Sequence, residues 1–313
     1  MKLLKSWKVK GFAQAVMSRM PGGMRLNDML QRRVGGLREF EANVASKVGD
    51  WVGIMKHLSA AGRGRVEGWT LVEIGSGWYP TLPVCFALAG ARRILTADLT
   101  RHMNEDLTLR MMRALAGQVE RIAETAQADP AEVRERYGRM AGCGSLRELL
   151  ETAGIEYLAP CDASRLVWVA DGTVDLVYSN SVMEHVAPEA IPGLMREAWR
   201  VLGPEGLMMH AVACNDHYAH FDRGISFVNY LQFTEREWRF WNNGLNYQNR
   251  LRAPEFPRLA RECGFRVVHE SRAVRAGTRE ALAAMKVAPE FSKYTLEELA
   301  ATSVDFVAAK KEF

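Results

Sequence analysis

The sequence has few cysteines, no long apolar run and little excess charge. The five cysteines are scattered, odd in number and without a C-x-x-C pair, which argues against a disulfide or zinc framework and favours a reducing cytoplasm. No stretch approaches the roughly 18 consecutive apolar residues that a membrane span needs. The formal net charge of +4 is too small to indicate a nucleic-acid partner by itself.

The first residues of the chain are basic and amphipathic. Lys5, Lys8 and Lys10 interrupt this segment, so it does not have the apolar core of a secretory signal. Trp7 and Phe12 lie between and after these lysines. We expect a terminal helix that docks on the protein's own body, and contact with an anionic membrane surface stays open as the alternative.

The chain then alternates between strands and helices. Residues 1–65 contain no clear strand and predict a helical N-terminal extension or lid. An apolar run at 69–74 ends in the turn Gly75-Ser76-Gly77, a helix follows, and a second strand at 93–97 closes on Asp98. Strand, glycine turn, helix and strand make a βαβ unit, which is typical of a parallel sheet covered by helices.

Residues 66–313 are predicted to form one α/β domain with a doubly wound, mostly parallel sheet. Two segments depart from the alternation and predict insertions, a helical one at about 101–155 and a polar, aromatic one at about 214–252. The further strands are expected at 157–160, 174–178, 207–212, 266–269 and 304–308.

Acidic residues lie at the ends of the first three predicted strands. Ligands of doubly wound sheets bind beyond the carboxyl ends of the strands, and Gly75 and Gly77 let the backbone approach such a ligand closely. Glu73 suits a cationic amino-acid group, Asp98 suits ribose hydroxyls, and Asp162 suits the exocyclic amine of an adenine. Each acid alone is more often a solvated loop residue, but acids at three successive strand ends indicate a binding site.

These motifs, in this order, resemble those of class I S-adenosylmethionine-dependent methyltransferases, and most of all their small-molecule branch. The motifs are Glu-x-Gly-x-Gly at 73–77, the acid Asp98, Asp162-Ala163, Asp175-Leu-Val-Tyr-Ser179 and Leu202-Gly-Pro-Glu-Gly206. The resemblance covers about 69–212 well and the later strands more loosely. It implies a seven-stranded sheet whose last strand runs antiparallel.

The resemblance also implies that S-adenosylmethionine is the cofactor. The residues expected to hold it are Glu73, Gly75, Ser76, Gly77, Asp98, Asp162, Ala163, Ser179 and Asn180. The sequence departs from the family at Tyr79, where a glycine is frequent. A nicotinamide dinucleotide is the main rival, because Asp98 lies about twenty residues past the glycines. However, the third glycine of that fingerprint would fall at Pro80, where no side chain belongs.

The segment after the fourth strand bears on the acceptor. It lacks the Asn/Asp-Pro-Pro-Tyr pattern of nucleobase-amine methylases, so no nucleic-acid acceptor is expected. Glu184-His185 resembles the Glu-x-x-Glu-His element with which ubiquinone-pathway and small-RNA-end O-methyltransferases bind a divalent metal. Because Ser181 stands in place of the first Glu, we expect no metal and activity that survives EDTA. The pair can instead brace the helix that starts at Pro188.

Histidine and aromatic residues supply the remaining candidates. His217, then His220 and His185, are the candidate general bases, because the unperturbed pKa of histidine suits proton transfer near neutrality. A second group offers aromatic walls and a cation for a polar acceptor, although a packed lid would look the same: Tyr218, Tyr230, Trp241, Tyr247 and Arg250.

The sequence thus predicts a cytoplasmic methyltransferase that methylates a small polar metabolite, sugar or natural product on O, N or S. The alternatives are a catalytically inactive binding or assembly protein of the same fold and, with less support, an NAD-dependent oxidoreductase. Intact acids at three strand ends favour the enzyme, since an inactive relative has no need of them.

Overall fold

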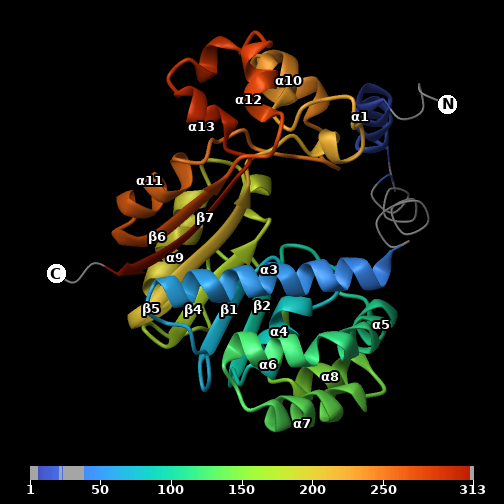
Figure 1. Ribbon diagram of the computed structural model, residues 1–313, viewed down its shortest axis with the longest axis vertical. Coiled ribbons are helices and arrows are strands. Elements are labelled where there is room, and N and C mark those ends of the chain that lie inside the picture. The colour runs from blue at the N-terminus through green and yellow to red at the C-terminus, as the bar shows by residue number, and fades with distance from the viewer. Residues whose placement is uncertain (1–5, 21–22, 24–38, 311–313) are drawn as a thin grey trace.

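The computed structural model describes residues 6–20, 23 and 39–310. Within these residues the chain builds a seven-stranded sheet with the order β3-β2-β1-β4-β5-β7-β6 (Figure 1). The strands are β1 (Thr70–Ile74), β2 (Arg93–Ala97), β3 (Ile155–Leu158), β4 (Val174–Asn180), β5 (Leu202–Ala213), β6 (Phe265–Ala273) and β7 (Ser303–Lys310). β7 runs antiparallel to both β5 and β6, whereas β1 to β5 pair in parallel. The predicted sheet is confirmed.

The central strands are apolar on both faces because helices cover both. Successive side chains of a strand point to opposite faces, and here Leu71 and Leu176 belong to one core while Val72 and Val177 belong to the other. A sheet of this kind has no solvent-facing side, so its strands read as continuous apolar runs instead of alternating ones.

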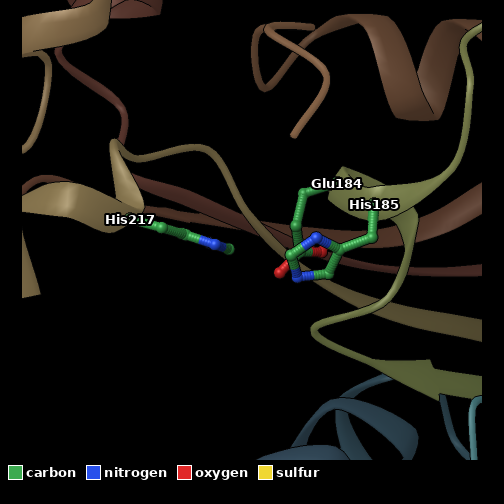
Figure 2. A group of neighbouring side chains, drawn as sticks. All are labelled: Glu184, His185 and His217. Atoms are coloured by element: carbon green, nitrogen blue, oxygen red, sulfur yellow. The ribbon is translucent and has the colours of Figure 1, made fainter. Parts of the chain in front are cut away.

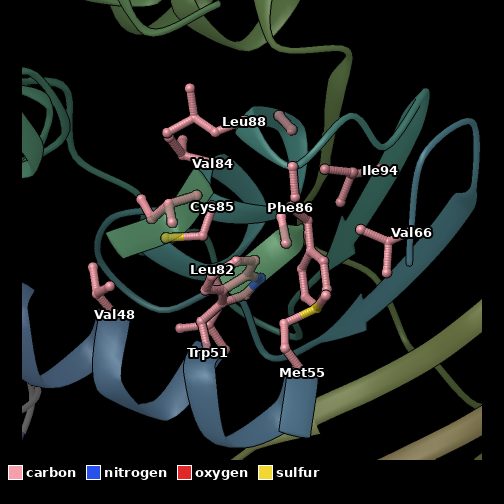
Figure 3. Close-up of a cluster of buried hydrophobic side chains, with 14 of the residues drawn as sticks. Val48, Trp51, Met55, Val66, Leu82, Val84, Cys85, Phe86, Leu88 and Ile94 are labelled. Atoms are coloured by element: carbon pink, nitrogen blue, oxygen red, sulfur yellow. The ribbon is translucent and has the colours of Figure 1, made fainter. Parts of the chain in front are cut away.

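The first face is covered by α3 (Phe40–Ala60), α4 (Thr81–Leu88) and four further helices. Figure 3 shows Trp51 and Met55 of α3 packed against Phe86 of α4. The Trp51 and Phe86 rings meet edge-on with centroids 6.0 Å apart. The four helices form the predicted insertion, and they are α5 (Glu105–Leu115), α6 (Val119–Ala126), α7 (Pro130–Ala141) and α8 (Leu146–Thr152).

The second face is covered by α9 (Ile191–Val201) and α11 (Glu255–Glu262). Beyond the end of β5, a third apolar cluster forms a cap over the sheet edge (Figure 1). The cap consists of the short turns η4 (His217–His220) and η5 (Asn229–Gln232) and the helices α10 (Glu235–Trp241), α12 (Thr278–Ala283) and α13 (Leu296–Ala300).

Helix α1 (Trp7–Met17) docks on this cap, beside α10 and away from α3 (Figure 1). The Trp7 ring lies 4.8 Å from the Trp241 ring, and the Trp7 backbone N–H donates to Asp222 at 3.0 Å. The described part of the basic segment is therefore a docked helix, whereas Lys5 lies outside the described residues. No helix among the described residues has the length and apolar character to cross a membrane. Helices α1 and α3 thus pack on different parts of the fold.

Candidate active site

A cavity of about 820 Å³ opens where β1, β2 and β4 end. Its walls come from the strand ends and the glycine turn, from the start of α4, and from one polar face of α3. Six of the predicted cofactor residues line it, namely Glu73, Gly75, Ser76, Gly77, Asp98 and Asn180. The cavity therefore lies where a doubly wound sheet binds its ligand.

The glycine turn shapes the floor of this cavity. Gly75 has a φ of +88°, and a Cβ atom built on it would lie 2.4 Å from Cγ2 of Val182. Gly77 also has a positive φ, and its backbone N–H donates to Oδ2 of Asp98 at 3.3 Å. Glycine is thus required twice, once by crowding and backbone conformation and once by conformation alone.

Glu73 is a buried carboxylate that still faces the cavity. Its side chain is among the buried polar groups, and burial raises the pKa of Glu73 to about 7. The Thr96 hydroxyl lies 2.5 Å from Oε2 of Glu73 and 2.6 Å from the Ser76 hydroxyl. Because Thr96 has one proton, it donates to Glu73 and accepts from Ser76. A ligand cation at Glu73 would restore the ionised form that burial disfavours.

Ser179, Asp162 and Ala163 were also predicted to hold the cofactor, but they do not line the cavity. Asn180 lines the cavity, but Ser179 is fully buried on the opposite side of the strand, where its hydroxyl lies 2.7 Å from Nδ1 of His210. Asp162 accepts from the backbone N–H of Ser164 at 2.9 Å and lies outside the cavity lining. Ala163 is part of the core of the second face. The expectation for the Ser179 side chain is corrected, because alternation along β4 turns it inward.

Sequence reasoning missed the wall that α3 supplies. Asn43, Ser46, Lys47 and Asp50 line the cavity from this helix. The amide of Asn180 donates to Asp50 at 3.1 Å, and the Lys47 amino group lies 3.4 Å from Asp50. The signal was present in the sequence, since polar residues at positions i, i+3, i+4 and i+7 make one face of a helix.

A second cavity of about 400 Å³ adjoins the first. The two share Asp50, Asn180 and Ser181 as lining residues. The smaller cavity continues between α3 and the ends of β5 and β7, where Nε2 of His57 lies 3.3 Å from Asp305. It therefore has a polar wall on the side away from Glu73.

The three histidines predicted as bases gather beside the larger cavity. The rings of His185 and His217 are 5.0 Å apart, and those of His217 and His220 are 6.0 Å apart. Burial lowers the pKa of His217 to about 3, with smaller contributions from the two other imidazoles and from Lys10. A group with such a pKa is a weak proton acceptor at neutral pH. The choice of His217 as the leading general base stays a prediction, and the burial of this imidazole counts against it.

Glu184 lies next to these imidazoles. Ligand atoms of Glu184, His185 and His217 all lie within 4.8 Å of one another (Figure 2). Burial raises the pKa of Glu184 to about 8. The argument against a metal rested on Ser181 alone, and it does not hold here because another donor, His217, comes from the segment after β5.

The aromatic and basic residues predicted to hold an acceptor belong mainly to the core of the cap. Tyr230 is fully buried, and its hydroxyl accepts from Arg252 at 2.6 Å. Tyr218 donates to the backbone oxygen of Trp241 at 2.8 Å, and Arg250 donates to that of Tyr230 at 3.1 Å. The packed-lid alternative applies to Tyr218, Tyr230 and Arg250, since their polar atoms bond within the cap. It also applies to Trp241, whose ring packs against Trp7. Tyr247 contributes a backbone oxygen, which accepts from His185.

Comparisons with known proteins agree with this arrangement. A family model described as a methyltransferase domain matches residues 67–270. The chain belongs to this methyltransferase family. The match confirms the class expected from the motifs, an S-adenosylmethionine-dependent methyltransferase of class I, in place of an oxidoreductase. No curated protein matches the chain significantly.

Solved structures of similar fold include several methyltransferases. Geranyl diphosphate C-methyltransferase from Streptomyces coelicolor A3(2) is 15% identical, with 87% of this chain and 84% of that chain covered and a TM-score of 0.47. An S-adenosylmethionine-dependent methyltransferase from Mesorhizobium loti is 16% identical, with 83% and 100% covered and a TM-score of 0.44. These structures are too distant to indicate the acceptor of this methyltransferase.

Proposed function

We propose that this methyltransferase binds S-adenosylmethionine in the larger cavity and transfers its methyl group to a small polar acceptor. The observation that carries the proposal is the pair of carboxylates, Glu73 and Asp98, on either side of the Gly75–Gly77 turn. Glu73 would meet the ammonium group of the methionine moiety. Asp98 would accept hydrogen bonds from the ribose hydroxyls.

The acceptor would enter the smaller cavity. It adjoins the cofactor cavity at Asp50, Asn180 and Ser181, so a molecule in it could reach a methyl group presented from the other side. Its polar wall suits a metabolite, sugar or natural product with hydroxyl, amine or thiol groups. The methyl group of a sulfonium is already activated, so positioning of the two reactants is the main task, and positioning contributes on the order of 7–11 kcal/mol.

The proposal is tested by offering the enzyme methyl-labelled S-adenosylmethionine with separate pools of polyols and sugars, small amines, and thiols. We expect S-adenosylhomocysteine release in one pool and label in the acceptor. Asp305→Asn, in the smaller cavity, should raise the KM for that acceptor without changing the affinity for S-adenosylhomocysteine. Glu205→Gln is the matched control, because this exposed carboxylate pairs with Arg63 away from both cavities.

A different result would favour the inactive alternative. If the protein binds S-adenosylhomocysteine but no pool yields methylated product, the cofactor half of the proposal stands and the acceptor half fails. Label in nucleic acid in place of these pools would contradict the small-molecule assignment.

A further inference from the structure

Three side chains from distant parts of the sequence meet at the rim of the cofactor cavity. Glu184 and His185 belong to the turn η3 (Met183–His185) after β4, and His217 begins η4 after β5. Figure 2 shows the His217 ring pointing with its nitrogen end toward the other two side chains. Their ligand atoms lie within 4.8 Å of one another, and His185 also lines the cavity. We call these residues the Glu-His-His cluster.

Glu184 is the member of this cluster whose side chain most lacks polar partners. Its side chain is 1% exposed, and neither carboxylate oxygen has a hydrogen-bond partner of good geometry among the described residues. The backbone N–H groups of Glu184 and Ala213 lower the pKa of this carboxyl group, but by less than burial raises it. A buried carboxylate is costly unless a proton or a cation compensates it.

His185 is oriented for a cation. Its Nδ1 lies 2.7 Å from the backbone oxygen of Tyr247. Because a carbonyl oxygen only accepts, Nδ1 carries the proton and Nε2 keeps its lone pair. Histidines that bind metals almost always donate their other ring N–H in this way, which fixes the tautomer and the orientation of the ring.

Three successive residues support the three members of the cluster. The Tyr247 oxygen holds His185, and the Gln248 side-chain oxygen accepts from the backbone N–H of His217 at 3.3 Å. The backbone N–H of Asn249 donates to the backbone oxygen of Glu184 at 2.7 Å, and the Asn249 side chain donates to the backbone oxygens of Met183 and Val186. One short segment, 247–249, thus bonds to all three members of the cluster and holds them near one another.

We propose that Glu184, His185 and His217 bind one divalent transition-metal ion of the zinc type. Two imidazoles and one carboxylate suit zinc, iron, cobalt or nickel, whereas magnesium and calcium prefer oxygen ligands. Ligands around a tetrahedral ion with bonds of about 2.1 Å stand roughly 3.4 Å apart. Because the ligand atoms lie within 4.8 Å of one another, binding would need only a small approach of these side chains.

The role of this ion rests on the function proposed above. With three protein ligands, the ion would keep at least one open position. His185 lines the larger cavity, so that position would be reached by an acceptor that extends from the smaller cavity past the shared residues Asn180 and Ser181. The chemistry that such an ion would supply is a lower pKa of an acceptor hydroxyl, whose proton would pass to water. The oxygen could then take the methyl group as the bond between the methyl carbon and sulfur breaks, with S-adenosylhomocysteine as the leaving group. The inferred acceptor class is a hydroxyl compound.

The site is tested by titrating the metal-stripped protein with Zn²⁺ and, for a visible spectrum, with Co²⁺. We expect one ion per chain and a cobalt spectrum typical of nitrogen and oxygen ligands. Glu184→Gln and His217→Ala should each weaken binding at least 10- to 100-fold. His220→Ala is the matched control, since this imidazole is on the same turn as His217 but faces Asn215, with 3.1 Å between Nε2 and Oδ1. Its metal affinity should stay within about twofold of the parent.

The titrations are paired with S-adenosylhomocysteine binding and thermal unfolding of each variant. Unchanged S-adenosylhomocysteine affinity with lost metal binding supports the metal site and leaves the cofactor site intact. Equal Zn²⁺ affinity in the parent, Glu184→Gln and His217→Ala would overturn the proposal, and so would binding of Mg²⁺ in preference to Zn²⁺. Failure of the methyl-transfer assay with the metal bound would instead count against the proposed function. Glu184→Gln is close in shape to the parent and replaces the carboxyl ligand with an amide, so it serves if His217→Ala fails to fold.

Discussion

The cofactor cavity and the Glu-His-His cluster lie at the same edge of the sheet, but the chain builds them by different means. Glu73 lies in β1 near its end, Gly75 and Gly77 follow β1, and Asp98 follows β2. Because β1 and β2 pair directly, the parallel ladder itself brings these residues together. The cluster comes from two turns after β4 and β5 and depends on the segment 247–249 to hold them. One site follows from the secondary structure, and the other exists only after tertiary packing.

The largest loss of stability should come from replacing Arg252, a buried residue of the cap beside the Glu-His-His cluster. Arg252 is fully buried and donates to the backbone oxygens of Cys214, Leu299 and Ala301 and to Tyr230. Arg252→Leu leaves these acceptors unpaired and should lower the free energy of unfolding by about 3–5 kcal/mol. Urea unfolding measures this loss. Arg147→Leu is the control, because Arg147 and Glu151 form an ion pair that is exposed on both sides, and its loss should cost less than about 1 kcal/mol.

One outcome with Arg252→Leu would contradict a purely structural role of the cap. If Arg252→Leu unfolds at the same urea concentration as the parent but no longer binds acceptor, the cap residues are ligand contacts and not a structural support.

The next effect concerns the glycine turn. Gly75→Ala should lower the free energy of unfolding by about 2–4 kcal/mol, because a positive φ and the contact with Val182 both oppose a side chain. Gly77→Ala meets open space and should lose only the conformational part. Thermal unfolding of both variants gives the difference. Adding Val182→Ala should recover part of the loss for Gly75→Ala and none for Gly77→Ala, and equal losses in both glycine variants would contradict this account of the turn.

Glu73 should make binding in the cofactor cavity depend on pH. Because the pKa of Glu73 is raised to about 7, its charge is lost as the pH falls through 7, so S-adenosylhomocysteine should bind more weakly at pH 6 than at pH 8. Glu73→Gln should weaken binding about 10- to 100-fold at pH 8, the usual loss of a hydrogen bond to a charged group, and should flatten this pH dependence. Calorimetric titration at both pH values measures it.

The same shift has a consequence for stability. A carboxyl with a raised folded-state pKa binds its proton more tightly in the folded protein, so it contributes stability at low pH that is lost as the pH rises from about 4.5 to about 7. Glu73→Gln should therefore be more stable than the parent at pH 8 and nearly equal to it at pH 4.5. The opposite order would contradict the buried position of this carboxylate.

The smallest effect is expected at the α3 wall. Lys47→Ala removes a partly exposed ion pair with Asp50, 3.4 Å long, and should change the free energy of unfolding by less than about 1 kcal/mol. Asp50→Ala also removes the acceptor of the Asn180 amide, which faces both cavities, so its loss should exceed that of Lys47→Ala. Identical unfolding curves for the two variants would show that the bond to Asn180 contributes nothing.

The sequence could predict what depends on neighbours along the chain. The sheet, its antiparallel last strand and the acids after β1 and β2 follow from periodicity, turn residues and a familiar motif order. It could not place His217 beside Glu184, because no spacing rule connects residues after β4 and β5. It also could not separate Tyr230 or Arg250 in a packed cap from the same residues lining a pocket, since both need aromatic and basic side chains. The polar face of α3 can be recognised in the sequence, but the sequence does not show that this face lines the cofactor cavity.

The central claim is that the larger cavity holds S-adenosylmethionine through the residues after β1 and β2. It is tested most directly by calorimetric titration of S-adenosylhomocysteine into the parent and into Asp98→Ala, with NAD as the control ligand. The account predicts binding in the parent, a loss of about 1.5–3 kcal/mol of binding free energy in the variant, and no heat from NAD. Equal affinity of the parent and Asp98→Ala, or binding of NAD in place of S-adenosylhomocysteine, would contradict it.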